Sequence, residues 1–245
     1  MSYLQRMLSN DIEALGQGEA CDALLLTAKA RVIATTTVWR RGADDYLLLT
    51  EPSLGDALLA ELRRFRFAAK LELEPETHLS TLVLGDEAPP GAIRNGDYGL
   101  PAYELLDGDP PADAVPIDDD ALERLRIEAL TPRVGREIDD RVLPAEAGLE
   151  ERAISFTKGC YPGQEPVARL HYRGHANREL RVLEIEGDEL PEYDAPLTAG
   201  DAVVGRVTSA VRAPGGTIVA LGYVRREVPV DAELRVDGTR RVRSA

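Results

Sequence analysis

Hydrophobic residues recur at helical spacing in three segments of the chain. A helix over residues 3–15 is predicted from apolar positions three and four apart: Leu4, Met7, Leu8, Ile12 and Leu15. Ser53 can cap a second helix, whose apolar face would comprise Leu54, Leu58, Leu62, Phe65 and Ala69. A third helix is predicted over residues 118–130, because its opening aspartates suit the positive end of a helix.

Other segments are rich in Leu, Val, Ile and Thr and are bounded by turn residues, which predicts strands. In the first half these are residues 23–27, 31–40, 46–50 and 77–84, with a hairpin turn at 42–45 and loops over 85–103. From about residue 178 one strand follows another, at 179–186, 202–212, 217–226 and 233–236. This second pattern is typical of a small barrel or sandwich.

The change of pattern divides the chain into two parts. We expect residues 1–176 to form an α+β region of two interleaved lobes with a Pro- and Asp-rich connection near 107–117, and residues 177–245 to form a C-terminal β module. The predicted fold class is therefore α+β, with a small C-terminal β-barrel.

Composition narrows the classes of function. The 245 residues carry a formal net charge of −14, which repels duplex nucleic acid, so nucleic acid is not an expected partner. No apolar stretch approaches the ~20 residues of a membrane span, and the first residues lack the apolar core of a signal peptide. Two cysteines cannot make a disulfide framework, so the expected location is cytoplasmic.

The most unusual segment is ISFTKGCYPGQEPVARLHYRGHANR, residues 154–178. Glycines and a proline around Cys160 require a sharp turn, which can hold a thiol in a cleft, and Lys158 could lower its pKa. Hydrogen-bonding groups follow directly in the sequence, on Tyr161, Gln164 and Glu165. The alternative is that Cys160 is a small buried apolar residue, as free cysteines often are.

A metal site in this segment is the weaker alternative. Cys160, His171 and His175 could supply three ligands, but the histidines lie in a segment that has the character of a strand rather than a helix. No second cysteine of a zinc site is nearby. We therefore expect no metal and interpret the histidines as solvent-facing or hydrogen-bonding groups.

A second candidate is Glu128, near the end of the third predicted helix and shortly before a proline and a glycine. A carboxylate there can accept two N–H donors from a planar heterocycle. The alternative is a solvated carboxylate paired with Arg124 or Arg126, which contributes well under ~1 kcal/mol.

Several of these segments resemble one known family. The sequence KGCYPGQE at 158–165 is similar to the hallmark of the YgfZ family of folate-binding proteins, relatives of the glycine-cleavage T-protein, a tetrahydrofolate-dependent aminomethyltransferase. The similarity continues elsewhere in the same order along nearly the whole chain: LQRMLSNDIEALGQG at 4–18, PAEAGL at 144–149, GRVTSA at 205–210 and IVALGYVRR at 218–226.

The resemblance implies an aminomethyltransferase-like fold with antiparallel sheets, in which three lobes surround a channel for tetrahydrofolate. It also implies a role in making or maintaining iron–sulfur enzymes, with iron–sulfur assembly proteins or client enzymes as partners. By position Cys160 matches the family's thiol, and Glu128 matches the carboxylate that holds the pterin ring. Arg169, Arg173 and Arg178 could meet the glutamate tail of the folate through their planar guanidinium groups.

The chain departs from the family in three ways. The family has further residues before the first predicted helix, so we expect either a short form or a misplaced start. Thr35 and Thr36 occupy the place of an Asp-Asp pair in T-proteins, and a threonine cannot carry the charge that aminomethyl transfer uses. Leu130 stands where a glycine is expected, and its side chain could narrow the pterin end of the pocket.

Three functions are compatible with these observations. The first is a tetrahydrofolate-binding factor for the synthesis or repair of iron–sulfur enzymes, with Cys160 as its thiol. The second is a folate-dependent one-carbon transferase, which would need a general acid or base beside the folate. The third is an interaction protein that kept the fold without the ligand.

Overall fold

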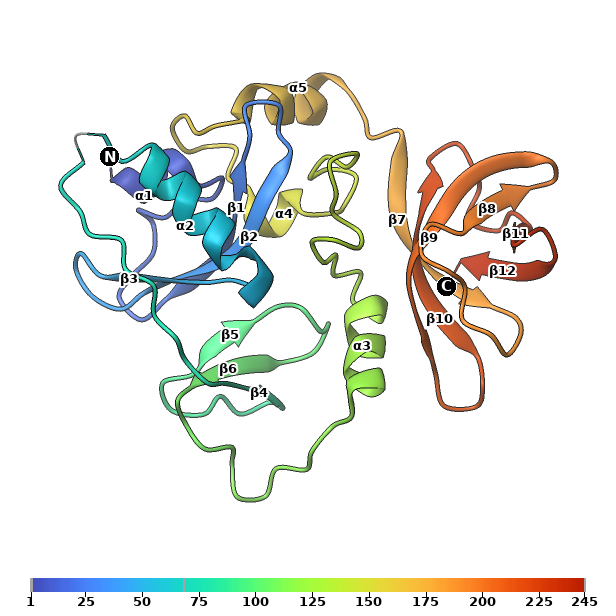
Figure 1. Ribbon diagram of the computed structural model, residues 1–245, viewed down its shortest axis with the longest axis horizontal. Coiled ribbons are helices and arrows are strands. Elements are labelled where there is room, and N and C mark those ends of the chain that lie inside the picture. The colour runs from blue at the N-terminus through green and yellow to red at the C-terminus, as the bar shows by residue number, and fades with distance from the viewer. Residues whose placement is uncertain (1, 68, 245) are drawn as a thin grey trace.

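The computed structural model describes residues 2–67 and 69–244. Three units follow one another along the chain, each built on an antiparallel sheet (Figure 1). The first sheet has the order β1-β2-β3, the second has the order β4-β6-β5, and the third closes into a barrel with the order β10-β7-β12-β11-β8-β9. An α+β fold with a closed C-terminal barrel is thus confirmed.

The first unit comprises α1 (Tyr3–Met7), β1 (Ala20–Leu26), β2 (Val32–Arg40), β3 (Tyr46–Leu49), the short 3-10 helix η1 (Pro52–Leu54) and α2 (Gly55–Arg64). Strand β1 is buried on both faces, because its side chains alternate between two cores. Ala23 and Leu25 pack with the residues of α1 and α2. Leu24 and Leu26 pack instead against the segment that surrounds the KGCYPGQE loop. The first sheet therefore packs against that segment through Leu24 and Leu26 of β1.

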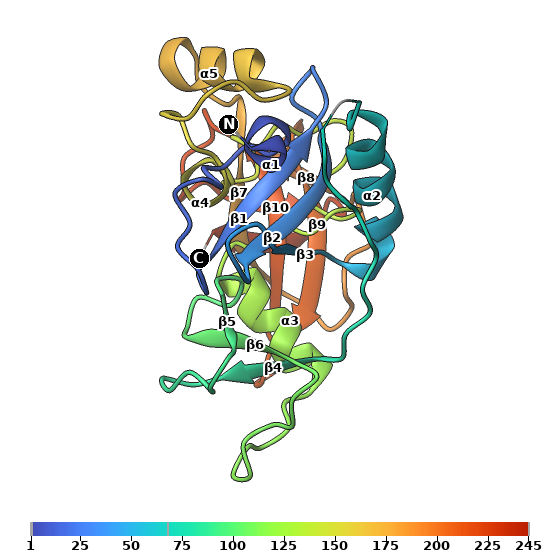
Figure 2. The same ribbon diagram turned by 90° about the vertical axis from the view of Figure 1, so that its left-hand side faces the viewer.

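The second unit comprises β4 (Ser80–Leu84), β5 (Ile93–Asn95) and β6 (Ala102–Leu106), which a long loop connects to α3 (Asp119–Glu128). Helix α3 lies between the second sheet and the barrel (Figures 1 and 2). Its Ile127 is fully buried against Val211, Val219 and Leu221 of the barrel. This contact ties the end of α3 to the third unit.

Two short helices, α4 (Glu150–Ala153) and α5 (Gln164–Arg173), lead into the barrel, which comprises β7 (Arg178–Ile185), β8 (Pro196–Ala199), β9 (Ala202–Arg212), β10 (Ile218–Arg225), β11 (Leu234–Val236) and β12 (Arg240–Ser244). Its interior is aliphatic, with fully buried residues that include Leu183, Leu197 and Ile218. The barrel contacts the preceding segment through Tyr223, whose hydroxyl donates to the Glu137 carbonyl at 3.1 Å.

The first predicted helix is wrong beyond its opening turns, since α1 ends at Met7. Leu8 is extended and forms an isolated bridge with Leu25. The next two side chains bond to other segments: Ser9 Oγ accepts from Leu24 N at 2.8 Å, and Asn10 Nδ2 donates to the Asp22 carbonyl at 2.7 Å. Because these short polar side chains compete with helical hydrogen bonding, the helix stops although the apolar spacing continues.

The strand-like interpretation of the segment that holds the two histidines is also wrong. Helix α5 covers residues 164–173 and carries His171, whereas His175 follows the helix end. The ring of His171 stacks on Phe156 with 3.8 Å between centroids. Among residues 2–67 and 69–244, no group of three His, Cys, Asp or Glu side chains could hold a metal ion. The same residues include no helix long and apolar enough to span a membrane.

Candidate functional site

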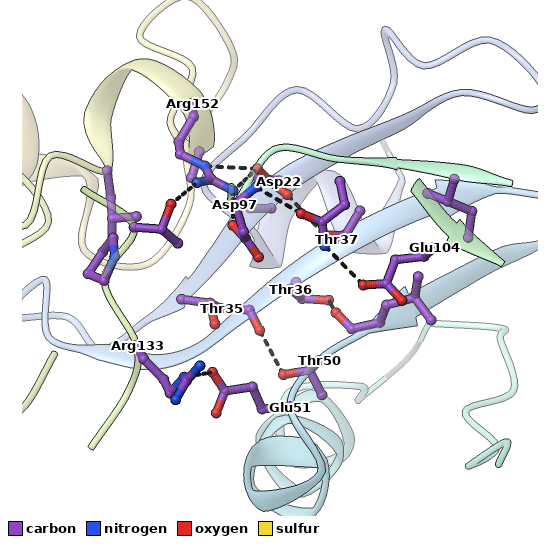
Figure 3. Close-up of a pocket in the computed structure, with 18 of the residues that line it drawn as sticks. Asp22, Thr35, Thr36, Thr37, Thr50, Glu51, Asp97, Glu104, Arg133 and Arg152 are labelled. Atoms are coloured by element: carbon purple, nitrogen blue, oxygen red, sulfur yellow. Dashed lines mark hydrogen bonds and ion pairs between the residues drawn. The ribbon is translucent and has the colours of Figure 1, made fainter. Parts of the chain in front are cut away.

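A cavity of about 540 Å³ lies where the first sheet, the second sheet and the segment after α3 meet. Its wall includes strand residues of β1 and β2, the β3–η1 connection, the loop after β5, and the side chains of Arg126, Arg133 and Arg152 (Figure 3). The volume falls within the range of about 300–1,000 Å³ found for small-molecule sites. Because its residues come from elements far apart in the sequence, no single motif marks it.

Arg152 connects three of these elements across one side of the cavity. From α4, its guanidinium contacts Asp22 of β1 at 2.7 Å and Asp97 of the loop after β5 at 2.6 Å (Figure 3). Asp22 also accepts from the Thr37 hydroxyl of β2 at 2.9 Å. The carboxylates of Asp22 and Asp97 are thus engaged by Arg152 and Thr37, and these contacts hold the cavity wall in place.

Three consecutive threonines of β2 line the cavity: Thr35, Thr36 and Thr37. Thr36 donates its hydroxyl to the Leu49 carbonyl at 2.9 Å, and the Thr35 carbonyl accepts from the Thr50 hydroxyl at 2.7 Å. These bonds pin β2 to the end of β3. The two positions singled out from the sequence as replacements of acidic residues therefore line the cavity, and neither supplies a negative charge.

Among the carboxylates of the cavity wall, Glu51 and Asp97 each contact one arginine, and the ion pair of Glu51 is the longer of the two. The ion pair of Glu51 is with Arg133, at 3.7 Å (Figure 3). Burial raises the pKa of Glu51, with Arg133 acting in the opposite direction. By contrast, Glu104 already accepts from Asn95 at 2.9 Å and from the Ser80 hydroxyl. Glu51 is therefore the carboxylate best placed to accept hydrogen bonds from a ligand.

Behind the cavity lies an ion pair that is closed off from solvent. Arg126 of α3 donates to Glu137 at 3.1 Å, and their side chains are 4% and 0% exposed. Glu137 also accepts from the hydroxyls of Thr208 and Ser209 at 2.7 Å each. Arg126 donates further to Glu123 and to the Thr131 carbonyl. This network joins the end of α3, the segment after it and the barrel.

None of the eight site residues nominated from the sequence lines this cavity. Cys160 is exposed, in the turn that precedes α5. Lys158 is buried and its ammonium donates to three carbonyls of the N-terminal segment, those of Gln5 at 2.6 Å, Leu8 at 2.5 Å and Asn10 at 2.9 Å. Burial lowers the pKa of Lys158 to about 8. Lys158 therefore anchors the loop to the first unit.

The residues that follow Cys160 divide between the interior and the surface. Tyr161 is buried, its ring lies 5.2 Å from the Lys158 ammonium, and burial raises its pKa to about 12. Gln164 and Glu165 form the first turn of α5, and Glu165 is exposed. Arg169 and Arg173 are exposed on the same helix. The loop and helix thus present Cys160 beside a polar, solvent-facing surface.

Two other positions lie apart from this surface. Arg178 begins the barrel and pairs with Glu146 at 3.0 Å. Glu128 ends α3, where its side chain is 42% exposed and pairs with Arg124 at 3.0 Å. Sequence reasoning missed Glu51, Asp97 and Arg152, because each is an ordinary charged residue whose placement depends on the tertiary fold.

Leu130 lies two positions after the end of α3, directly after the C-cap residue Ala129, and has a left-handed conformation with φ of 56°. Its side chain is exposed and lies outside the cavity wall. Thr131 N donates to the Arg126 carbonyl at 3.1 Å, and this hydrogen bond closes the helix end. In helix ends of this type the left-handed position, here Leu130, is usually a glycine. The glycine that the resemblance leads us to expect at position 130 is therefore explained by the left-handed backbone of this helix end.

We expect Leu130→Gly to raise the free energy of unfolding by about 0.5–1 kcal/mol, because the left-handed conformation costs a non-glycine residue about 1–2 kcal/mol and glycine recovers part of this. Urea denaturation measures the change. Leu130→Ala keeps the positive φ and is the matched control, so an equal gain in both variants would contradict the explanation.

Comparison with known proteins gives relatives along nearly the whole chain. The chain is 28% identical to the "tRNA-modifying protein YgfZ" of Serratia proteamaculans, over 96% of this chain and 82% of the relative. It is 26% identical to an "Aminomethyltransferase" of Rubrobacter xylanophilus, over 91% and 71% of the two chains. No family model matches the chain.

Among solved structures, the glycine cleavage system aminomethyltransferase T of Bartonella henselae matches with a TM-score of 0.81. The match covers 99% of this chain and 79% of that chain, at 18% sequence identity, and it shows the fold. The resemblance found in the sequence is therefore confirmed: the chain is similar to the YgfZ proteins over nearly its whole length and has the fold of aminomethyltransferase T.

Proposed function

We propose that the cavity binds tetrahydrofolate or a folate derivative, and that the chain assists the synthesis or repair of iron–sulfur enzymes with Cys160 as a working thiol. The observation that carries the folate part is the 540 Å³ cavity, whose wall includes Glu51, a carboxylate with one long ion pair, to Arg133 at 3.7 Å. The iron–sulfur part rests on the similarity of KGCYPGQE to the family hallmark.

The groups in the cavity wall fit the parts of a folate. A pterin ring presents its 2-amino group and N3–H side by side, and a carboxylate such as Glu51 can accept from both. Tyr98 adds an aromatic side chain to the wall. Arg94 is exposed at the edge of the cavity and can meet the carboxylates of the glutamate tail. Arg169 and Arg173 remain candidates for a longer tail.

Glu51→Gln is expected to weaken tetrahydrofolate binding about tenfold or more, because an amide offers one acceptor and opposes the second ligand N–H with its own donors. Calorimetric titration measures the affinity. Glu128→Gln is the matched control, since it removes the same charge outside the cavity and tests the carboxylate inferred from the family. If Glu128→Gln alone weakens binding, the pterin lies near the end of α3 and Glu51 is not its partner.

Cys160→Ser is expected to abolish the ability of the chain to restore activity of iron–sulfur enzymes in a cell that lacks its own factor. The fold should be unchanged, because the side chain is exposed. Cys21→Ser is the control, since burial raises the pKa of Cys21 to about 11 and holds it as a thiol. Equal rescue by Cys160→Ser and the unmodified chain would show that the thiol has no role.

One observation favours a one-carbon transferase as the second candidate. Such an enzyme needs a general acid or base beside the folate, and Glu51 is a cavity carboxylate whose pKa is raised by burial. The threonines at 35 and 36 argue against the chemistry of the T-protein itself. Turnover of a methylamine-type substrate with tetrahydrofolate, lost in Glu51→Gln, would favour this candidate.

A further inference from the structure

The chain crosses from the first unit to the second over residues 69–79, which form neither helix nor strand (Figure 1). We call these residues the crossing segment. Its first part is held by apolar contacts, because Leu71 and Leu73 pack against the core of the first unit. Its second part, residues 74–79, has no buried side chain. Polar contacts therefore hold this second part in place.

Four charged side chains form a continuous series of contacts through the second part of the crossing segment. Arg41, in the turn between β2 and β3, donates through both terminal nitrogens to the Glu76 carboxylate at 2.8 Å each. Glu76 contacts Nε2 of His78 at 3.0 Å, and Nδ1 of the same ring contacts Asp107 at 2.6 Å. Asp107 is the residue after β6. The β2–β3 turn is thus connected to the second sheet through His78.

Asp107 also holds the end of the crossing segment through its backbone. Its Oδ1 accepts from Leu79 N at 2.9 Å, and its own N–H donates to the Leu79 carbonyl at 2.8 Å. Asp107 has φ of 53°, in the left-handed region that aspartate visits more readily than most residues. Ser80 follows directly, begins β4 and lines the 540 Å³ cavity. A change at His78 can therefore reach the cavity wall.

The two contacts of His78 require a charged ring. A protonated imidazole has two N–H donors, whereas the neutral ring has one and would direct a lone pair at a carboxylate oxygen. The charged groups that face His78 are Asp107, from the end of β6, and Glu76, on its own segment. Hydrogen bonds to Asp107 and to Glu76 raise the pKa of His78. Arg41 and His78 lower the pKa of Glu76 to about 2, and His78 also lowers the pKa of Asp107.

We propose that Arg41, Glu76, His78 and Asp107 form a pH-sensitive latch, which fixes the crossing segment and the start of β4 while His78 is protonated and releases them when His78 loses its proton. This proposal does not depend on folate binding. It describes a conformational device between the two units whose sheets border the cavity.

The direction of the pH dependence follows from the charges. The contribution of His78 is complete below the ordinary histidine pKa of about 6.5, and it is lost as the pH rises through the raised pKa of the folded chain. Glu76 and Asp107 remain ionised through this range, because their pKa values are lowered. The latch is therefore closed at mildly acidic pH and open at alkaline pH.

NMR titration of the three histidine rings in the full chain measures the protonation of His78 directly. We expect its midpoint to lie above the ordinary value of about 6.5, and His78→Gln identifies its signals. Asp107→Asn is expected to lower the midpoint, because an amide can still accept from Leu79 N but carries no charge toward His78. His175→Gln is the matched control, since His175 is exposed beyond α5 and its loss should leave the midpoint unchanged.

Hydrogen exchange at the Leu79 and Asp107 amides measures release of the latch. After correction for the intrinsic effect of pH on exchange, both amides are expected to exchange about threefold or more faster above the His78 midpoint than below it. His78→Gln should exchange at acidic pH like the open latch, whereas His175→Gln should behave like the unmodified chain. The amides of β10 in the barrel serve as the internal reference.

Three results would each overturn the proposal. The first is a His78 midpoint at or below the ordinary histidine value. The second is equal corrected exchange of the two amides on both sides of that midpoint. The third is a His78→Gln variant that keeps the protection of the unmodified chain at acidic pH.

Discussion

Replacing Arg126 by methionine is expected to lower the free energy of unfolding by about 3–5 kcal/mol, because the change leaves Glu137 as an uncompensated buried charge. Glu137 is 0% exposed and Arg126 is its ion-pair partner, at 3.1 Å. The same change releases Glu123 and the Thr131 carbonyl, so the segment that reaches the cavity loses its attachment to α3. Urea denaturation at neutral pH measures the loss.

Two further variants separate the buried pair from ordinary surface charge. Arg124→Met removes a similar arginine from the same helix, but its pair with Glu128 is partly exposed and should contribute under about 1 kcal/mol. Adding Glu137→Gln to Arg126→Met should recover part of the loss, since no charge is then left unpaired. Equal stabilities of Arg126→Met and Arg124→Met would contradict the interpretation of this network.

Gly163→Ala is expected to destabilise the chain by roughly 2–4 kcal/mol and to displace the KGCYPGQE loop. Gly163 has φ of 81°, and a Cβ there would lie 2.6 Å from the Thr27 carbonyl oxygen. The left-handed conformation costs an alanine about 1–2 kcal/mol, and forced overpacking costs a further 1–3 kcal/mol or so. The added Cβ would push the loop away from the β1–β2 turn. We therefore expect Cys160 and the start of α5 to shift.

Gly148→Ala is the matched control for this prediction. Gly148 also has a positive φ, of 70°, but a Cβ there would meet nothing within 4 Å. It should therefore lose only the conformational part, about 1–2 kcal/mol. Thermal unfolding of both variants, with the rate of Cys160 labelling by a thiol reagent, measures the two effects. If Gly163→Ala is no less stable than Gly148→Ala, close packing against Thr27 does not hold the loop.

Several strands could be predicted because they are rich in Leu, Val, Ile and Thr and are bounded by turn residues. The prediction for residues 202–212 coincides with β9, and that for 217–226 differs from β10 by one residue at each end. Strand β12 was missed, since four of its five residues are polar and only Val242 is buried in the core. Helix α5 was missed because a glycine and two prolines mark its beginning as a turn, and Val167 is its one buried residue.

The candidate site shows the same contrast between local and tertiary information. The KGCYPGQE loop could be identified because its chemistry is concentrated in eight consecutive residues. The cavity could not, since Glu51, Asp97 and Arg152 become neighbours only when three separate elements pack together. Sequence position also did not show that Lys158 is directed at carbonyls of the N-terminal segment, because that contact spans about 150 residues.

Folate binding in the cavity is tested most directly by a crystal structure of the full chain grown with 5-formyltetrahydrofolate. We predict a pterin ring beside Thr35 and Thr36, with its amino group and N3 within about 2.7–3.2 Å of the Glu51 carboxylate. The glutamate tail should extend toward Arg94. A ligand bound elsewhere, such as at the end of α3 beside Glu128, or an empty cavity at saturating ligand, would contradict this assignment.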